Sequence, residues 1–274
     1  MRVVYAHTDS IYVPIESIEK AEKICKEVNT HVQELFPNLL GLSDHPVQLE
    51  FEKYYQSLGV GCTKNRNAGY ISWKDGEYLD EPEFIVTGFS MKRISESKIA
   101  KEFQKNLLQM WASVTPYDEV MDYCKKVYND VKKGRVQLTD IIKRGRVRQE
   151  LNTYASVSGG IAGVCYYNQH ISPNDPITDS FLFIECSRIE GPQWFMLPNG
   201  LRDRKATYIA VKEMKEFDDR FIPNWNAYAS KSIIKKAKPI FDAMGWNIKD
   251  IMIDENQREL SDWLKEGSEE NDIY

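Results

Sequence analysis

The sequence has little of what a zinc site, a disulfide framework or a membrane span requires. No Cys-x-x-Cys pair occurs, and the five cysteines are scattered along the chain, at Cys25, Cys62, Cys124, Cys165 and Cys186. This spacing favours reduced, buried thiols over metal ligands or disulfides. No run approaches the ~18 consecutive apolar residues of a membrane span. His7 and Asp9 interrupt the first apolar run, so no signal peptide is predicted. We therefore expect a cytoplasmic protein with no membrane partner.

Positive charge is in the minority, with 36 Lys and Arg against 41 Asp and Glu, and the net charge of −5 argues weakly against a nucleic-acid partner. Its distribution argues the other way, because seven basic residues and the single acid Asp140 lie between Lys132 and Arg148. A basic stripe on an acidic chain is typical of a DNA-binding face. The alternative is a solvated surface, which is common for short charge runs. The 274 residues allow one large or two modest domains.

Residues 3–13 pair two apolar, β-branched or aromatic runs with a polar tip, a pattern that predicts a β-hairpin. Asp9 stands at this tip. A carboxylate on a tight turn is held rigidly, which suits a hard divalent cation. Turn chemistry alone also explains a Thr-Asp-Ser sequence.

The rest of the chain alternates helical and strand patterns. Ser17 is a candidate N-cap for a helix that Pro37 terminates, and its apolar stripe predicts a core face. Asp75-Gly76 predicts a hairpin turn, and the Gly-rich stretch 156–163 predicts a flexible turn that lacks the ending of a phosphate loop. Strands are expected at 47–55 and 181–189, and further helices at 99–110, 120–131 and 224–244.

Four stretches resemble parts of family B DNA polymerases, and one of them, residues 88–104, resembles archaeal members in particular. Residues 5–10 resemble motif C, Tyr-Gly-Asp-Thr-Asp-Ser, with Asp9 at the principal metal-ligand position and His7 replacing the first aspartate. Residues 63–71 resemble the Lys-Lys-Arg-Tyr-Ala-Gly motif that grips the primer–template duplex, with Asn65 and Asn67 as replacements. Residues 88–104 resemble the passage from palm to thumb, and residues 257–264 resemble a sliding-clamp-binding box.

The resemblance implies an α+β fold: a partial palm, built from an antiparallel sheet with a packed helix, and then a mainly helical thumb with a small β element. The implied domains are half of a palm at 1–95, a thumb at 96–253, and a clamp-binding box with an acidic disordered tail at 254–274.

The resemblance also implies the site residues. Asp9 is the catalytic Mg²⁺ ligand, with His7, Glu50 and Glu52 as accessory candidates, although a neutral imidazole is a poor Mg²⁺ ligand. The implied DNA-binding residues are Thr8, Lys64, Asn65, Arg66, Asn67, Lys143, Arg144, Arg146 and Arg148. The implied clamp-binding residues are Gln257, Leu260, Trp263 and Leu264.

Motif A, which supplies the other catalytic aspartate, and the fingers motif are absent from this sequence. Because two metal ions need carboxylates from both motifs, we expect no polymerisation by this chain alone. The resemblance therefore implies the small subunit of a split polymerase. Its partners would be a large subunit with motifs A and B, primer–template DNA, dNTP and the sliding clamp. The alternative, motivated by His7, Asn65 and Asn67, is an inactivated remnant that binds DNA and the clamp as an accessory protein.

Overall fold

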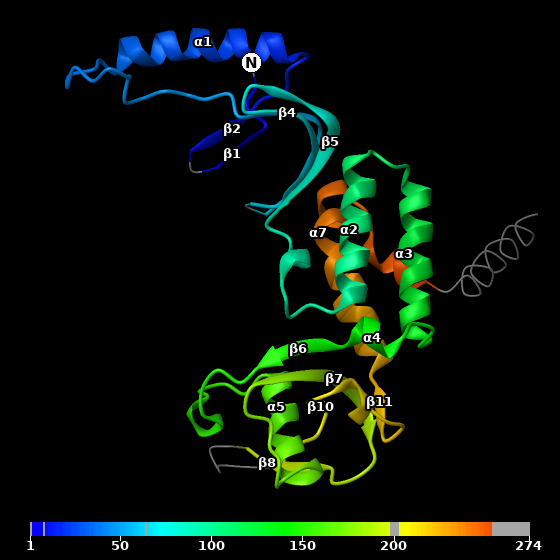
Figure 1. Ribbon diagram of the computed structural model, residues 1–274. Coiled ribbons are helices and arrows are strands. Elements are labelled where there is room, and N and C mark those ends of the chain that lie inside the picture. The colour runs from blue at the N-terminus through cyan, green and yellow to red at the C-terminus, as the bar shows by residue number, and fades with distance from the viewer. Residues whose placement is uncertain (1, 8, 64, 198–202, 254–274) are drawn as a thin grey trace, which may run out of the picture. The chain divides into compact units, whose positions relative to one another are not determined.

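The structure, a computed structural model, describes residues 2–7, 9–63, 65–197 and 203–253 (Figure 1). Its contacts divide the chain into two compact units. The first comprises Met1–Phe89 and Leu108–Val114, and the second comprises Ser90–Leu107 with the described residues from Thr115 onward. All strand pairings are antiparallel among the described residues, and helices accompany the sheets in both units. The predicted α+β class is confirmed.

The first unit contains two separate antiparallel sheets. β1 (Tyr5–His7) and β2 (Ser10–Tyr12) form the predicted N-terminal hairpin, with Tyr5 opposite Tyr12 and His7 opposite Ser10. A three-stranded sheet follows, in the order β3 (Lys53–Val60), β4 (Asn67–Lys74) and β5 (Glu77–Thr87). Asp75 and Gly76 connect β4 to β5 with positive φ values of 50° and 97°, which confirms the predicted turn.

Helix α1 (Ile18–Leu35) forms as predicted, but its apolar stripe is not a core. The Ser17 hydroxyl accepts a hydrogen bond from the Lys20 amide at 3.2 Å, which confirms the N-cap. Of its 18 residues, Ile18 and Ala21 alone are buried. The stripe from Ile24 to Val32 is half-exposed because no described element covers it.

The strand expected at 47–55 is wrong in its first part, since β3 begins at Lys53. In place of a neighbouring strand, the Asn29 side chain from α1 pairs with the Leu49 backbone. Asn29 Oδ1 accepts from the Leu49 amide and Asn29 Nδ2 donates to the Leu49 carbonyl, both at 2.8 Å. The Phe51 ring stacks on Trp73 at 4.3 Å, so tertiary contacts hold this extended segment.

The second unit combines a helical part with a sheet (Figure 1). The central strand β7 (Ser180–Ile189) pairs with β6 (Lys143–Arg146), β10 (Tyr208–Val211) and β11 (Phe221–Pro223). The expected strand at 181–189 is confirmed. A small hairpin joins β8 (Trp194–Met196) and β9 (Asp203–Lys205).

Further helices form at the three places where the sequence predicts them, residues 99–110, 120–131 and 224–244. The larger ones are α2 (Lys98–Ala112), whose last turn belongs to the first unit, and α3 (Tyr117–Lys132). The expected helix at 224–244 forms as α6 (Trp225–Tyr228), a π-helical segment (Ala229–Ile234) and α7 (Lys235–Met244). Its last residue, Met244, is 44% exposed. The shorter segments are α4 (Leu138–Ile141), a π-helical turn (Tyr167–Ile171) and 3₁₀ turns at Ser90–Lys92, Leu151–Thr153, Met214–Glu216 and Ile248–Met252.

The flexible turn expected at 156–163 is wrong, because Ser158 caps a buried helix, α5 (Gly159–Tyr166). Glycine permits close approach here: a Cβ on Gly163 would lie 2.7 Å from the Ala210 amide nitrogen of β10. Burial of Ile161, Val164 and Cys165 against the sheet offsets the low helix propensity of glycine. In the part of the chain that the structure describes, no helix is long and apolar enough to cross a membrane.

Candidate functional site

Asp9 lies at the tip of the β1–β2 hairpin, and its side chain is exposed. Its Oδ1 accepts a hydrogen bond from the Ser10 hydroxyl at 3.3 Å. Aromatic contacts anchor the hairpin, since the Tyr12 ring lies 5.3 Å from Tyr5 and 6.1 Å from Tyr55 of β3. The Asp9 carboxylate therefore lies on a turn whose hairpin is held by the contact of Tyr12 with Tyr55 of β3. Thr8 and the side chain of His7 lie outside the described residues.

A contact that the sequence analysis missed connects the hairpin to the loop before β4. The Asn65 amide donates to the Tyr5 hydroxyl at 3.0 Å, and this hydroxyl donates to Asn65 Oδ1 at 3.4 Å. Asn65 has a left-handed φ of 61°, which asparagine tolerates. The two polymerase-like motifs, 60 residues apart in sequence, thus lie together in the first unit. No local sequence signal identifies Tyr5 as this link.

The loop before β4 presents fewer groups outward than its sequence suggests. Asn67 begins β4 and is 4% exposed, so its side chain does not face a duplex in this structure. The Arg66 guanidinium lies 6.0 Å from the Phe89 ring. Gly88 has a φ of 76°, and a Cβ there would lie 1.6 Å from the Asn65 carbonyl oxygen. Glycine is therefore required where the end of β5 passes this loop. Lys64 lies outside the described residues.

Asp9 opens onto a cleft of about 840 Å³ in the first unit. Glu50 and Glu52 line the same cleft, so the structure brings the predicted metal ligand and two accessory candidates to one cavity. All three side chains are exposed, and Glu52 Oε2 lies 3.4 Å from Lys53 Nζ. The remaining lining is mostly apolar and comes from the hairpin, from α1 and from residues 48–60.

These carboxylates do not form a metal centre by themselves. Among the described residues, no group of three His, Cys, Asp or Glu side chains is placed to hold a metal ion. A carboxylate oxygen is a donor that Mg²⁺ prefers, so Asp9 fits the role of one ligand. The remaining ligands would have to come from outside the described residues.

Of the basic stretch from Lys132 to Arg148, residues Lys143–Arg146 form strand β6, whose side chains alternate between two faces. Lys143 is half-buried and faces Glu96, Glu185, Lys231 and Lys236, and burial lowers the pKa of its ammonium group. Arg144, Arg146 and Arg148 are exposed. Arg146 Nε donates to Asp179 at 2.6 Å, whereas no ion pair is found for the other two exposed arginines of residues 143–148, Arg144 and Arg148, among the described residues. The clamp-box residues Gln257, Leu260, Trp263 and Leu264 lie outside the described residues.

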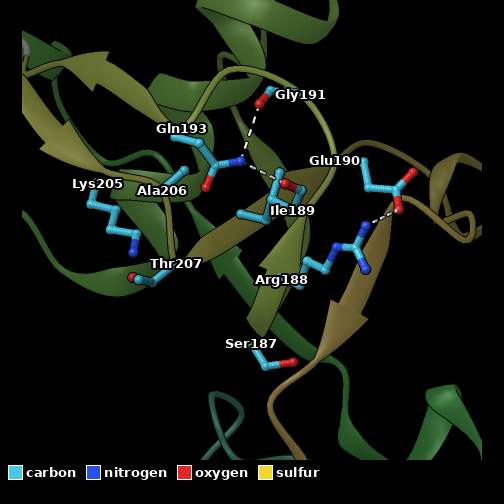
Figure 2. Close-up of a pocket in the computed structure, with 9 residues that line it drawn as sticks. All are labelled: Ser187, Arg188, Ile189, Glu190, Gly191, Gln193, Lys205, Ala206 and Thr207. Atoms are coloured by element: carbon cyan, nitrogen blue, oxygen red, sulfur yellow. Dashed lines mark hydrogen bonds and ion pairs between the residues drawn. The ribbon is translucent and has the colours of Figure 1, made fainter.

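A second cavity, of about 460 Å³, lies in the second unit beside β7 and β9 (Figure 2). Its polar side chains are largely bound to its own wall. Gln193 Nε2 donates to the carbonyls of Ile189 and Gly191 at 2.7 and 3.1 Å, and Arg188 pairs with Glu190 at 2.9 Å. The sequence analysis singled out none of these residues, and we assign this cavity no function.

Comparisons with known proteins match most of the chain. The sequence model of DNA polymerase family B matches residues 1–243. The DNA polymerase zeta catalytic subunit of Arabidopsis thaliana is 27% identical over 157 residues, which is 57% of this chain and 8% of the plant protein. The DNA polymerase of Thermococcus gorgonarius is 26% identical over 164 residues, which is 59% of this chain and 19% of that protein.

Among solved structures, the family B DNA polymerase from the hyperthermophilic archaeon Pyrobaculum calidifontis shares the fold with a TM-score of 0.57 and 18% identity. This match covers 87% of the present chain and 26% of that polymerase. The chain thus spans about a quarter of the solved polymerase, and its match covers less than a fifth of these two relatives.

Proposed function

This chain belongs to DNA polymerase family B, and on that premise we propose that it acts as the small subunit of a split DNA-directed DNA polymerase. The observation that carries the proposal is Asp9 at a hairpin tip, facing an open cleft and linked through Tyr5 to the loop that resembles the duplex-binding motif. A large subunit would supply motifs A and B and the remaining metal ligands. This chain would supply the motif C side of the palm, the thumb and the clamp tether.

The residues have distinct roles in this proposal. Asp9 holds catalytic Mg²⁺, and the ions would stabilise the charge that develops as the nucleotidyl group is transferred. Lys64 and Arg66 hold the primer–template duplex near the dNTP site, and exposed arginines of β6 neutralise backbone phosphates. Gln257, Leu260, Trp263 and Leu264 dock the sliding clamp.

A second candidate function is that of an inactivated polymerase remnant, which binds DNA and the clamp without catalysis. Two observations favour it. His7 replaces a motif C aspartate, and Asn67, which replaces the tyrosine of the duplex-binding motif, is buried. Neither removes Asp9, the principal ligand position, so we place the enzymatic proposal first.

The test starts with recovery of the tagged chain from its native host and mass spectrometry of the polypeptides that remain bound. We expect a second polypeptide with family B motifs A and B. When the two purified chains are mixed with primed template, Mg²⁺ and dNTP, primer extension should appear, while neither chain extends alone. No extension by the pair would favour the accessory function. A single native polypeptide that carries all motifs would contradict the split arrangement.

Replacement of Arg144 and Arg148 by alanine should weaken duplex binding equally for all sequences. If each arginine contacts one phosphate, the slope of log K against log salt should fall in magnitude by about 1.8. Fluorescence anisotropy with labelled primer–template at several salt concentrations measures this effect. Arg188→Ala is the matched control, because Arg188 is an exposed arginine of the same unit outside this stretch and should leave the slope unchanged. An unchanged slope in the double variant would exclude Arg144 and Arg148 from the DNA interface.

A further inference from the structure

The outer face of the β8–β9 hairpin in the second unit carries two large exposed side chains. Trp194 and Met196 are 57% and 56% exposed, whereas Phe195 between them is 3% exposed. This alternation places Phe195 on the inner face of β8, where its ring lies 6.2 Å from the Tyr166 ring. Phe195 therefore anchors β8 in the core, and the fold does not require a tryptophan or a methionine on the opposite face.

Hydrogen bonds to its backbone fix β8 along both edges. One edge pairs with β9, in a register that sets Trp194 opposite Lys205. Along the other edge, Gln169 Nε2 donates to the Met196 carbonyl at 2.8 Å and Gln169 Oε1 accepts from the Met196 amide at 2.9 Å. His170 Nε2 lies 3.0 Å from the Trp194 carbonyl oxygen. A ligand of this hairpin must therefore use the outer face, because Gln169 and His170 occupy the edge with which a peptide strand would pair.

A lysine shares the outer face with Trp194. Residues directly opposite each other in an antiparallel pair project to the same face, with Cβ atoms about 5 Å apart, so Lys205 stands beside Trp194. Lys205 is exposed, and no ion pair is found for its ammonium group among the described residues. Arg204, which lies opposite Phe195, instead donates from its guanidinium to the Val157 carbonyl at 3.0 Å. The outer face thus combines an accessible aromatic ring with an exposed cation.

We infer that the outer face of the β8–β9 hairpin binds single-stranded DNA, with one base stacked on the Trp194 indole and a neighbouring phosphate paired with Lys205. Sites for unpaired strands combine an aromatic ring, on which a base stacks, with cations that neutralise the backbone. A duplex cannot use this ring in the same way, because its bases already stack on each other. The chain belongs to a DNA polymerase family, which makes DNA the strand to test. The site needs neither Asp9 nor a large subunit, so it adds to the proposed function and does not depend on it.

The test measures binding of the full chain to a short labelled oligo(dT) by fluorescence anisotropy at low salt. Trp194→Ala should weaken binding about tenfold, as expected for the loss of one stacking ring, whereas Trp194→Phe keeps a ring and should stay within about threefold of the unmodified chain. Lys205→Ala should lower the magnitude of the slope of log K against log salt by about 0.7, the value for one phosphate of a single strand. Ile94→Ala and Lys249→Ala are the matched controls, because both residues are exposed in the second unit outside the hairpin, and they should leave affinity unchanged.

An oligonucleotide with abasic sites separates stacking from charge, because it keeps every phosphate and lacks the bases. It should bind the unmodified chain about tenfold more weakly than oligo(dT) does. The Trp194→Ala variant should bind both oligonucleotides alike, since the ring that distinguishes them is gone. A tryptophan that only supports the fold would not produce this difference. Circular dichroism and urea unfolding verify that the variants fold.

Absence of binding to oligo(dT) overturns the inference, and so does an affinity that Trp194→Ala leaves unchanged. If Trp194→Ala weakens binding to a blunt duplex as strongly as binding to the single strand, the face is a general DNA contact and the stacking role is wrong. If Trp194→Ala dissociates a dimer of the chain without changing DNA affinity, a second copy covers the face and the inference is also overturned. None of these results involves primer extension, so failure of this site and failure of the proposed function are distinguishable.

Discussion

Primer extension by the two-chain enzyme should disappear when Asp9 is replaced by alanine, with a loss of at least about a thousandfold in rate. The reason is that a single carboxylate of this chain, at the tip of the β1–β2 hairpin, would hold the catalytic Mg²⁺. Removal of a group that stabilises developing charge typically costs 10²–10³-fold or more. Single-turnover extension of a labelled primer at saturating dNTP measures the effect.

The matched control for Asp9 is Asp75→Asn, which changes an exposed carboxylate at the tip of another hairpin in the same unit. Asparagine tolerates the positive φ of 50° at this turn, so we expect normal folding and normal extension. Asp9→Asn keeps the shape of the side chain without its charge and should be nearly as inactive as the alanine variant. If Asp9→Ala extends primers at the rate of the unmodified chain, the enzymatic proposal is wrong.

The largest effect on stability is expected from Lys236→Ala in the second unit. Lys236 Nζ forms an ion pair with Glu96 Oε1 at 2.5 Å and donates to the Ser90 hydroxyl at 2.7 Å. The two charged side chains are 13% and 16% exposed. Truncation leaves the Glu96 carboxylate nearly buried without its cation, which costs about 3 kcal/mol of unfolding free energy. Urea unfolding followed by circular dichroism measures the loss.

Two variants give this prediction its controls. Lys238→Ala removes an exposed ion pair with Asp242 on the same helix, and such pairs contribute less than about 1 kcal/mol. The double variant Lys236→Met with Glu96→Leu removes both charges, and it should recover much of the stability because no unpaired charge remains. A Lys236→Ala variant as stable as Lys238→Ala would show that the pair is solvated in solution.

Sequence analysis could predict those parts of the candidate site whose residues are neighbours in the chain. Asp9 was placed at a hairpin tip by the alternation around it, and the hairpin is confirmed; its role as a metal ligand stays a prediction. The contact between Tyr5 and Asn65 could not be predicted, because 60 residues separate the two and each looks like an ordinary strand or loop residue. The surroundings of Lys143 could not be predicted either. Its strand was a candidate DNA-binding segment, but its half-buried side chain faces charged side chains from other parts of the second unit.

Sequence alone determined the elements whose signals are local. The period of apolar residues and the capping side chains identified α1, α2, α3 and the helix up to Met244, and Asp75-Gly76 identified its turn, because helices and tight turns depend on neighbours in the chain. Tertiary structure decided the rest. Gly159–Tyr166 is helical because β7 and β10 bury it, and residues 48–52 are extended without a sheet because Asn29 of α1 binds Leu49. Burial depends on segments distant in sequence, and local propensity does not encode it.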